Sequence, residues 1–208
     1  MASTLHEGQI HRGKKVTKIA IKKLSEKATV DVFVNNEPAP QSFDHVVTTL
    51  PFGCLRMVDM TECSLTWDLQ TAIRCLGYDS SVKIGVRFSE RWWEKLAISH
   101  YGGVSNTDRP TRVVVYPSYG MKEDEGATMI VSYTWAQDAL RFGACAQGKD
   151  NPAEIELLET VLNDLAAIHG IQEKDYLRGL LLDYKIHNWY TDADSCGTIF
   201  LHRVIELN

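Results

Sequence analysis

The chain has 208 residues, of which 44% are hydrophobic and 24% charged, and its formal net charge is −5. These proportions are typical of soluble globular proteins and exclude collagen-like, low-complexity and wholly disordered chains. No run of eighteen apolar residues occurs, so no transmembrane helix is expected, and the opening MASTLHEGQIHRGKKV lacks the apolar core of a secretory signal. The length predicts one large domain or two small ones.

The cysteines carry no sign of a metal site or of a disulfide framework. Five are present, an odd number, and no two of them form C-x-x-C or complete a zinc pattern with histidine. Free thiols in a reducing, intracellular compartment are therefore predicted, with no metal ligand set.

The net charge is distributed unevenly. Residues 1–27 hold seven Lys/Arg against two Glu, a local charge of +5, which leaves −10 for the remainder. No aromatic residue is interleaved with these cations, as base stacking on single-stranded nucleic acid would need. In VTKIAIKKL the lysines alternate with apolar residues, which favours a strand with one solvated face. No nucleic-acid partner is predicted.

Strand patterns outnumber helical patterns along the chain. β-Branched or alternating runs predict strands at 15–22, 28–34, 45–50, 81–88, 112–116 and 128–133. The run 45–50 is almost wholly apolar or β-branched and ends at Pro51, which is typical of a buried strand. Helices are expected at 69–76, 89–96 and 152–169, the last with Asn151-Pro152 at its start and Gly170 at its end. The fold class is mixed α and β with sheet dominant.

Standard catalytic motifs are absent from the sequence: it has no P-loop, G-x-S-x-G, H-E-x-x-H or G-x-G-x-x-G. Three local features still point to chemistry. Lys83 interrupts the apolar and small run SSVKIGVRF, where it is either a lysine on the wet face of a half-buried strand or a buried ammonium with a role. Tyr116 ends RVVVY at a proline turn. Trp189 and Gly197 lie in HNWYTDADSCGTIF, where aromatic and small residues either line a planar slot or cap a core.

The order of these segments resembles the flavin-dependent amine oxidases, and among them the L-amino-acid oxidases. The resemblance runs over about residues 8–200, through KKVTKIAI, FDHVVTTLP, AIRCLGYDSSVKIGVRFSERWWEK, GGVSNTDRPTRVVVYPSYG, TVLNDLAAIHGI and HNWYTDADSCGTIF. It implies an α+β fold in which a substrate-binding region with a mixed or antiparallel sheet joins part of a Rossmann-like FAD-binding domain. It also implies FAD as cofactor and a small amine or amino acid as substrate.

The resemblance assigns roles to five residues. Lys83 matches the lysine that hydrogen-bonds a water near the flavin N5, Tyr116 the tyrosine that helps to bind the substrate carboxylate, and Trp189 the tryptophan beside flavin and substrate. Ile199 matches an aliphatic wall of the side-chain pocket, and Val16 a position whose main chain contacts the adenine of FAD. The implied reaction is oxidative deamination to an imine or keto acid, ammonia and hydrogen peroxide.

The family pattern also predicts the domain organisation and an alternative. Residues 1–58 are expected to form part of the FAD-binding region, 59–185 the substrate-binding domain, and 186–208 the start of the return to the FAD domain. The family's G-x-G-x-x-G segment, its carboxylate-binding arginine and its closing Gly-Glu segment have no counterpart in this sequence. The alternative is a truncated, catalytically inactive relative. Uncovered faces would then predict poor solubility, or association with a second copy or a complementing chain.

Overall fold

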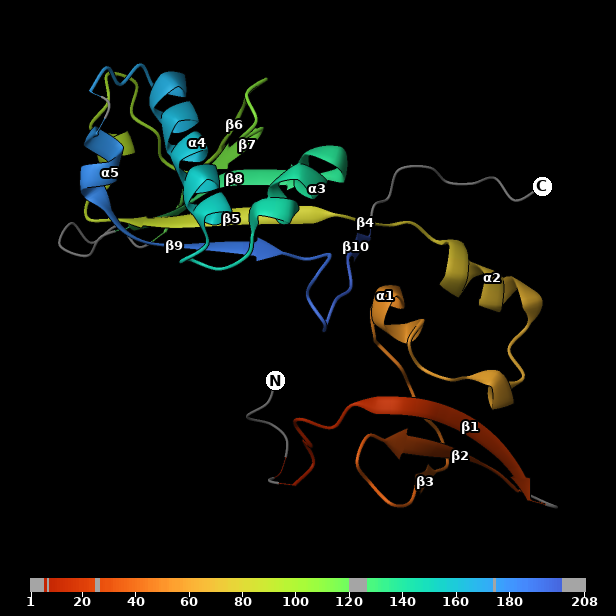
Figure 1. Cartoon of the computed structure of the whole chain (residues 1–208). Helices are drawn as coiled ribbons and strands as arrows, with labels where there is room; N and C mark the ends of the chain where they lie inside the picture. Colours follow the sequence, from red (N-terminus) through yellow and green to blue (C-terminus); the bar gives the residue numbers. More distant parts are fainter. Residues whose placement is uncertain (1–5, 7, 25–26, 120–126, 174, 200–208) are drawn as a thin grey trace. The chain divides into compact units, whose positions relative to one another are not determined.

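A computed structural model gives the structure of residues 6, 8–24, 27–119, 127–173 and 175–199, without the side chains of Leu24 and Ile199. The chain divides into two compact units, Met1–Gly77 and Tyr78–Asn208 (Figure 1). Each unit has its own main antiparallel sheet. In the part of the chain that the structure describes, no helix is long and apolar enough to cross a membrane.

The first unit begins with a three-stranded antiparallel sheet in the order β1-β2-β3. Strand β1 spans Val16–Leu24, β2 spans Lys27–Val34 and β3 spans Gln41–Phe43. The middle of β1 buries Ile19 and Ala20, while the lysines that follow stay exposed. The predicted strands 15–22 and 28–34 are therefore confirmed, but the lysines do not form one solvated face, because Lys18 is half-buried, Ile21 is exposed, and the consecutive Lys22 and Lys23 point to opposite faces.

Short helices follow the sheet of the first unit. Helix α1 spans Phe52–Leu55, a 3-10 turn spans Thr61–Cys63, and α2 spans Trp67–Cys75. Thr66 caps α2, because its hydroxyl accepts a hydrogen bond from Leu69 N at 3.3 Å and so satisfies one free amide of the first turn. The helix predicted at 69–76 is confirmed and begins two residues earlier than expected.

The buried strand predicted at 45–50 is wrong. Residues 44–50 form no strand, and their side chains are exposed, with Val47 at 87%. Pairing with β2 ends at Phe43, and no other described segment offers the run a hydrogen-bonding edge. β-Branched residues favour an extended backbone, but a strand also needs a neighbour to accept and donate its ladder bonds.

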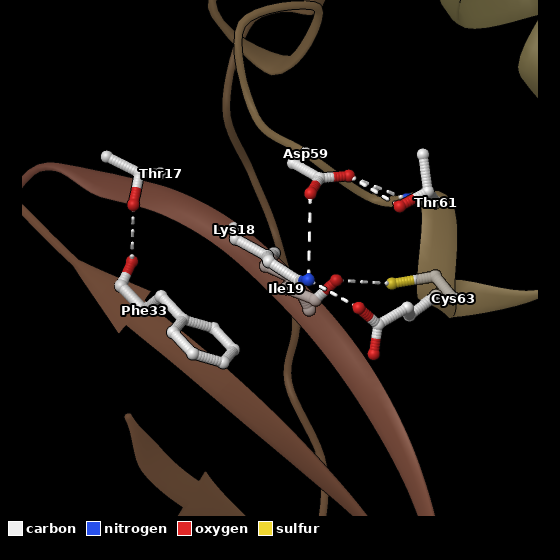
Figure 2. Close-up of polar contacts among 8 residues, drawn as sticks. Thr17, Lys18, Ile19, Phe33, Asp59, Thr61 and Cys63 are labelled. Carbon is white, nitrogen blue, oxygen red and sulfur yellow. Dashed lines mark hydrogen bonds and ion pairs between the residues drawn. The ribbon is translucent and has the colours of Figure 1, made fainter. Parts of the chain in front are cut away.

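A polar cluster ties β1 to the segment after α1 (Figure 2). Lys18 Nζ contacts the Glu62 carboxylate and lies 3.7 Å from Asp59 Oδ2. Asp59 Oδ1 in turn accepts hydrogen bonds from Thr61 N at 3.0 Å and Thr61 Oγ1 at 2.8 Å. These partners raise the pKa of Lys18 and lower that of Asp59, because each favours the charged form. The Lys18 ammonium is therefore paired with two carboxylates and is not a candidate for binding a ligand.

Cys63 belongs to the same cluster and is expected to react slowly. Its Sγ donates to Ile19 O at 3.1 Å, and burial together with the nearby carboxylates of Asp59 and Glu62 raises the pKa of its thiol. The thiolate is the reactive species, so iodoacetamide at pH 8 should alkylate Cys63 several-fold more slowly than the exposed Cys75. Peptide mass spectrometry over time measures both rates. Equal rates in the folded chain would contradict the contact, whereas equal rates in denaturing urea are expected.

The second unit is built on a five-stranded antiparallel sheet in the order β6-β7-β8-β5-β9. Strand β5 lies between the two other long strands, β8 and β9, and pairs with both along its length. A separate two-stranded ladder pairs β4, which immediately precedes β5 in the chain, with β10. The strands are β4 Tyr78–Asp79, β5 Ser81–Phe88, β6 Val104–Asn106, β7 Val113–Val115, β8 Ala127–Trp135, β9 Leu181–Asn188 and β10 Thr198–Ile199.

Helices cover one face of this sheet. Helix α3 (Ala136–Cys145) packs against β5 and β8, α4 (Pro152–Ile168) packs against α3 and β8, and the short α5 (Tyr176–Leu180) packs against α4 (Figure 1). Asn151 caps α4 by accepting from Ala153 N at 2.9 Å, and Pro152 occupies its first turn as predicted. The confirmed helix 152–169 therefore supplies most of the cover.

The core of the second unit lies between β5 and α4. Val82 and Ile84 of β5 and Val161 and Leu165 of α4 are fully buried there. Each such side chain contributes about 1.5–3 kcal/mol relative to an exposed position. This burial uses only one face of β5, which leaves the opposite face for a site.

Two sequence expectations for this unit need correction. The helix predicted at 89–96 is only a 3-10 turn, Trp92–Glu94, because the backbone at Arg91 (φ −86°, ψ 66°) lies outside the helical region. The turn buries the rings of both Trp92 and Trp93 in the core, in a T-shaped contact at 5.7 Å. Helix α3 and strand β9 were not predicted. The α+β class with antiparallel sheets is confirmed.

Candidate functional site

Lys83 lies near the middle of β5, on the face of the sheet that the helices do not cover. The side chains of Val82, Ile84 and Val86 are fully buried, whereas Lys83 is half-buried and Arg87 is exposed. This alternation follows from the period of two in a strand. Lys83 is therefore the lysine of a half-buried strand, as the first of the two sequence interpretations held, and not an ammonium sealed inside the core.

Four ring side chains surround Lys83 on that face. Tyr133 on β8 and His187 on β9 are its direct cross-strand partners. Lys83 Nζ lies 4.6 Å from the centre of the Tyr133 ring and 5.8 Å from that of Trp189. Trp135 packs edge-on against Tyr133 at 5.2 Å, and His187 packs edge-on against Trp189 at 4.3 Å. We call these five residues the Lys83 face.

The Lys83 ammonium is held by rings rather than by a counter-charge. Within the described residues, no carboxylate lies within ion-pair distance of its Nζ. A cation over an aromatic ring gains about 0.5–1 kcal/mol at an exposed site and about 2 kcal/mol or more when it is desolvated. The rings do not satisfy the three N–H donors of a lysine, so these donors remain available for acceptor atoms of a ligand.

The loop after β9 holds Trp189 in place. Trp189 N donates to Ser81 O at 3.0 Å, which extends the pairing of β9 with β5 by one residue. Trp189 O accepts from Gly197 N at 2.8 Å and from Ser195 Oγ at 3.1 Å. Gly197 has φ +116°, and a Cβ there would lie 3.3 Å from Asp79 O, so a larger residue would strain the closure of the loop.

Tyr116 lies on the opposite, helix-covered face of the sheet. It is 3% exposed and belongs to the core with residues of α4. Its hydroxyl lies 2.6 Å from His169 Nε2 and 3.0 Å from Ser105 Oγ, and the His100 ring stacks on its ring at 4.6 Å. The structure thus brings Trp189 to Lys83 but does not bring Tyr116 there. A carboxylate-binding role for Tyr116 stays a prediction from the resemblance.

The Tyr116–His169 contact is a neutral hydrogen bond. His169 Nδ1 lies 2.7 Å from Leu165 O, a pure acceptor, so Nδ1 carries the proton and Nε2 accepts from the Tyr116 hydroxyl. Burial lowers the pKa of His169 and raises the pKa of Tyr116, which keeps both uncharged near neutral pH. The pair joins the end of β7 to the end of α4.

The buried His169 predicts a pH dependence of stability. Its pKa in the folded chain is below the ordinary 6.5, so between these two values the unfolded state binds more protons. The free energy of unfolding should therefore fall as the pH drops through about 6.5, and His169 should add no further loss below its own folded pKa. Urea unfolding followed by tryptophan fluorescence between pH 8 and pH 5 measures this. His169→Gln should flatten the slope in that window, whereas the exposed His45→Gln should not; a slope unchanged by His169→Gln would contradict the assignment.

The two remaining predicted site residues lie outside the Lys83 face. Val16 is the first residue of β1 in the first unit, where it pairs with Val34. The backbone of Ile199 pairs with Tyr78 in the β10–β4 ladder, but its side chain is outside the described residues. Their roles toward adenine and the substrate side chain stay predictions, and so do the domain limits 1–58, 59–185 and 186–208.

A small cavity with a mixed polar and apolar lining adjoins the Lys83 face. Its volume is about 160 Å³, and Tyr133 and Trp135 form one side of it. Arg112 and Asp138 also line it, with Arg112 Nε 3.4 Å from Asp138 Oδ2. A cavity of about 150 Å³ admits a benzene ring, so this one has room for a group of about six heavy atoms. Among the described residues, no cluster of three His, Cys, Asp or Glu side chains could hold a metal ion.

Comparison with known protein families identifies the family to which the chain belongs. The family described as "Flavin containing amine oxidoreductase" matches residues 1–202 of the chain. The chain belongs to this family. The predicted membership is therefore confirmed, and the Lys83 face is part of a protein whose family contains flavin and acts on small molecules.

The curated relatives of this amine oxidoreductase chain are much longer than it is. A Dictyostelium discoideum protein that carries the name of a bifunctional amine oxidase is 37% identical over 97% of this chain and 19% of its own length. L-amino-acid oxidase 4 of Hebeloma cylindrosporum is 39% identical over 72% of this chain and 24% of its own length. The chain thus spans about a fifth to a quarter of the length of these two relatives.

Solved structures show the same amine oxidase fold. Cyclohexylamine oxidase from Brevibacterium oxydans superposes with a TM-score of 0.66 at 16% identity, over 88% of this chain and 35% of that one. Putrescine oxidase gives a TM-score of 0.62 at 14% identity, over 89% and 36%. At these identities the likeness shows the fold alone, which is the predicted α+β architecture.

Sequence reasoning missed three members of the Lys83 face: Tyr133, Trp135 and His187. Tyr133 closes the predicted strand 128–133, but its neighbour across the sheet depends on a register that has a bulge between Ile84 and Gly85. His187 lies in β9, which the pattern LLDYKIHN did not indicate. The usable signal was the alternating Tyr-x-Trp and His-x-Trp spacing, which places two rings on one strand face.

Proposed function

We propose that this chain contributes the Lys83 face to a flavin-dependent oxidase that deaminates an L-amino acid or another amine. The products are an imine or keto acid, ammonia and hydrogen peroxide. The observation that carries the proposal is the Lys83 ammonium, held between two rings and without a counter-charge in the described structure. A family that contains flavin supplies the context.

The Lys83 face suits the ring end of FAD. Its tryptophan and tyrosine rings offer flat apolar surfaces, and the Lys83 N–H groups suit the nitrogen and carbonyl acceptors along the edge of a flavin ring. The pyrophosphate end usually rests on a glycine-rich turn, and the 208 residues contain no G-x-G-x-x-G. The fit therefore supports the ring end only.

In the proposed reaction, Lys83, Trp189 and Tyr133 have different roles. When bound, FAD supplies the acceptor for the hydride of the substrate α-carbon and the route of the electrons to oxygen. Lys83 holds a water or ring acceptor by its N–H donors, and Trp189 excludes bulk water from one side of that donor. Tyr133 covers Lys83 and also lines the cavity, so it lies between the reacting end of a substrate and its side chain.

The cavity beside Tyr133 is the proposed place for the substrate side chain. Its lining includes Arg112 and Asp138, with Arg112 Nε 3.4 Å from Asp138 Oδ2, and Arg141 Nη1 lies 3.1 Å from the other oxygen of the same carboxylate. A neutral side chain that accepts hydrogen bonds fits such a lining better than an aliphatic one, because the contacts of Arg112 with Asp138 and with Asp108 O use only some of its five N–H donors.

A second proposal is a catalytically inactive relative that keeps the fold without binding FAD by itself. The glycine-rich turn that its 208 residues lack would be the physical reason, because the amides of such a turn hold the pyrophosphate.

Flavin retention separates the two proposals. The purified chain is mixed with FAD and passed through gel filtration, and absorbance near 450 nm is followed in the protein fraction. Co-elution of flavin supports the oxidase, and hydrogen peroxide release over a panel of L-amino acids and primary amines then identifies the substrate. We expect amino acids with carboxamide side chains to release peroxide faster than aliphatic ones of the same length. A colourless protein fraction would reject autonomous oxidation by this chain.

A further inference from the structure

His187, a member of the Lys83 face, lies between the Trp189 ring and the Asp192 carboxylate. Its ring packs edge-on against Trp189, with 4.3 Å between the ring centres and an angle of 78° between the planes. On the other side its Nε2 lies 3.3 Å from Asp192 Oδ2. That nitrogen is buried, and the Asp192 carboxylate is within ion-pair distance of it although the contact does not have hydrogen-bond geometry.

Asp192 organises the loop that carries Trp189. Its Oδ1 accepts from Asp194 N at 2.9 Å and from Ser195 N at 3.1 Å, and its backbone oxygen accepts from Cys196 N at 2.8 Å. These backbone donors lower the pKa of Asp192, so the carboxylate is charged at neutral pH. One oxygen therefore shapes the loop while the other faces His187.

The same loop returns to Trp189. Ser195 Oγ and Gly197 N both donate to Trp189 O, so the residues that Asp192 orders also hold the Trp189 backbone. The Trp189 ring then has His187 on one side and the Lys83 ammonium, 5.8 Å from its centre, on another. Trp189 therefore contacts both His187 and Lys83.

We propose that His187 and Asp192 form a positioning pair that fixes the Trp189 ring against Lys83. Asp192 sets the loop and His187 transmits its position to the ring, so the pair sets the shape of the slot that a planar ligand would enter. The functional meaning of the slot rests on the proposed oxidase, but the positioning itself is a property of this chain. His187 touches neither substrate nor cofactor in this assignment and acts through Trp189.

The test follows the Trp189 ring directly and needs no flavin. The full chain is labelled with 5-fluorotryptophan, which gives five ¹⁹F signals for its five tryptophans. The signal that disappears in Trp189→Phe is assigned to Trp189. The signals of the fully buried Trp92 and Trp93 report that the second unit is folded in every variant.

We expect His187→Ala and Asp192→Asn each to move the Trp189 signal most of the way to its position in the urea-unfolded chain, with Trp92 and Trp93 unmoved. The double variant should move it no further than the larger single change, because both act through one contact. His187→Gln keeps a nitrogen that can face Asp192 and should hold the signal closer to wild type than His187→Ala does. The exposed His45→Ala is the matched control and should leave the signal in place.

Three results would overturn the proposal. The first is a Trp189 signal that does not move in Asp192→Asn. This variant tests the proposal by itself if His187→Ala does not fold. The second is a double variant whose shift equals the sum of the two single shifts. The third is equal displacement by His187→Gln and His187→Ala. Failure of the oxidase proposal would appear separately, as a chain that retains no FAD while Trp189 responds as expected.

Discussion

Replacement of Lys83 by methionine is expected to slow substrate oxidation by the FAD-loaded chain by about 10²- to 10⁴-fold, the range found when a positioned hydrogen-bonding or proton-transfer group is removed. Methionine keeps the length of the side chain between the Tyr133 and Trp189 rings but removes all three N–H donors. The affinity for FAD should fall much less, because the rings that we propose as flavin contacts remain. Stopped-flow reduction of the flavin measures the rate, and flavin fluorescence measures the affinity.

Lys185→Met is the matched control for this experiment. Lys185 is an exposed lysine on β9 and a cross-strand neighbour of Gly85, two residues along from Lys83. It removes the same charge from the same sheet without touching the rings, so the rate should stay within about twofold of wild type, as is usual for exposed sites. Equal losses of rate and affinity in Lys83→Met would contradict the proposed role and indicate a purely structural lysine.

Replacement of Tyr116 by phenylalanine is expected to lower the free energy of unfolding by about 1–3 kcal/mol, the cost of a buried polar group left without its partner. The change removes the hydroxyl that donates to His169 Nε2 and accepts from Ser105, while the ring stays in the core. Urea unfolding at pH 7.5, followed by tryptophan fluorescence, measures the loss. The pH dependence assigned to His169 should change in the same variant, because the two groups share one hydrogen bond.

Tyr119→Phe is the control, since Tyr119 is 77% exposed and its hydroxyl makes no contact in the described structure. Its effect should lie within about 0.5 kcal/mol. The same pair of variants tests the role that the family resemblance assigns to Tyr116. If Tyr116→Phe keeps its stability and instead weakens substrate binding, the phenol serves the substrate and the hydrogen bond to His169 is dispensable.

Local sequence patterns were sufficient to predict the elements whose structure depends mainly on residues close together in the chain. The hairpin of β1 and β2 and the long helix α4 follow from alternation, a capping Asn-Pro and helical spacing, all of which lie within a few residues. The order of motifs along the chain also indicated the family that the comparisons confirm. By contrast, the run 45–50 has the composition of a strand but no neighbour to pair with, so composition alone misled.

The sequence by itself determined that Lys83 interrupts an apolar strand, because residue type and order carry that information, and the family resemblance predicted a shared site for Lys83 and Trp189. Only the tertiary structure decided which residues surround Lys83. Antiparallel pairing with a bulge selects Tyr133 and His187 as its neighbours, and the helices that cover the other face take Tyr116 into the core. Sheet register and the choice of buried face depend on contacts between residues far apart in the chain, which no local pattern encodes.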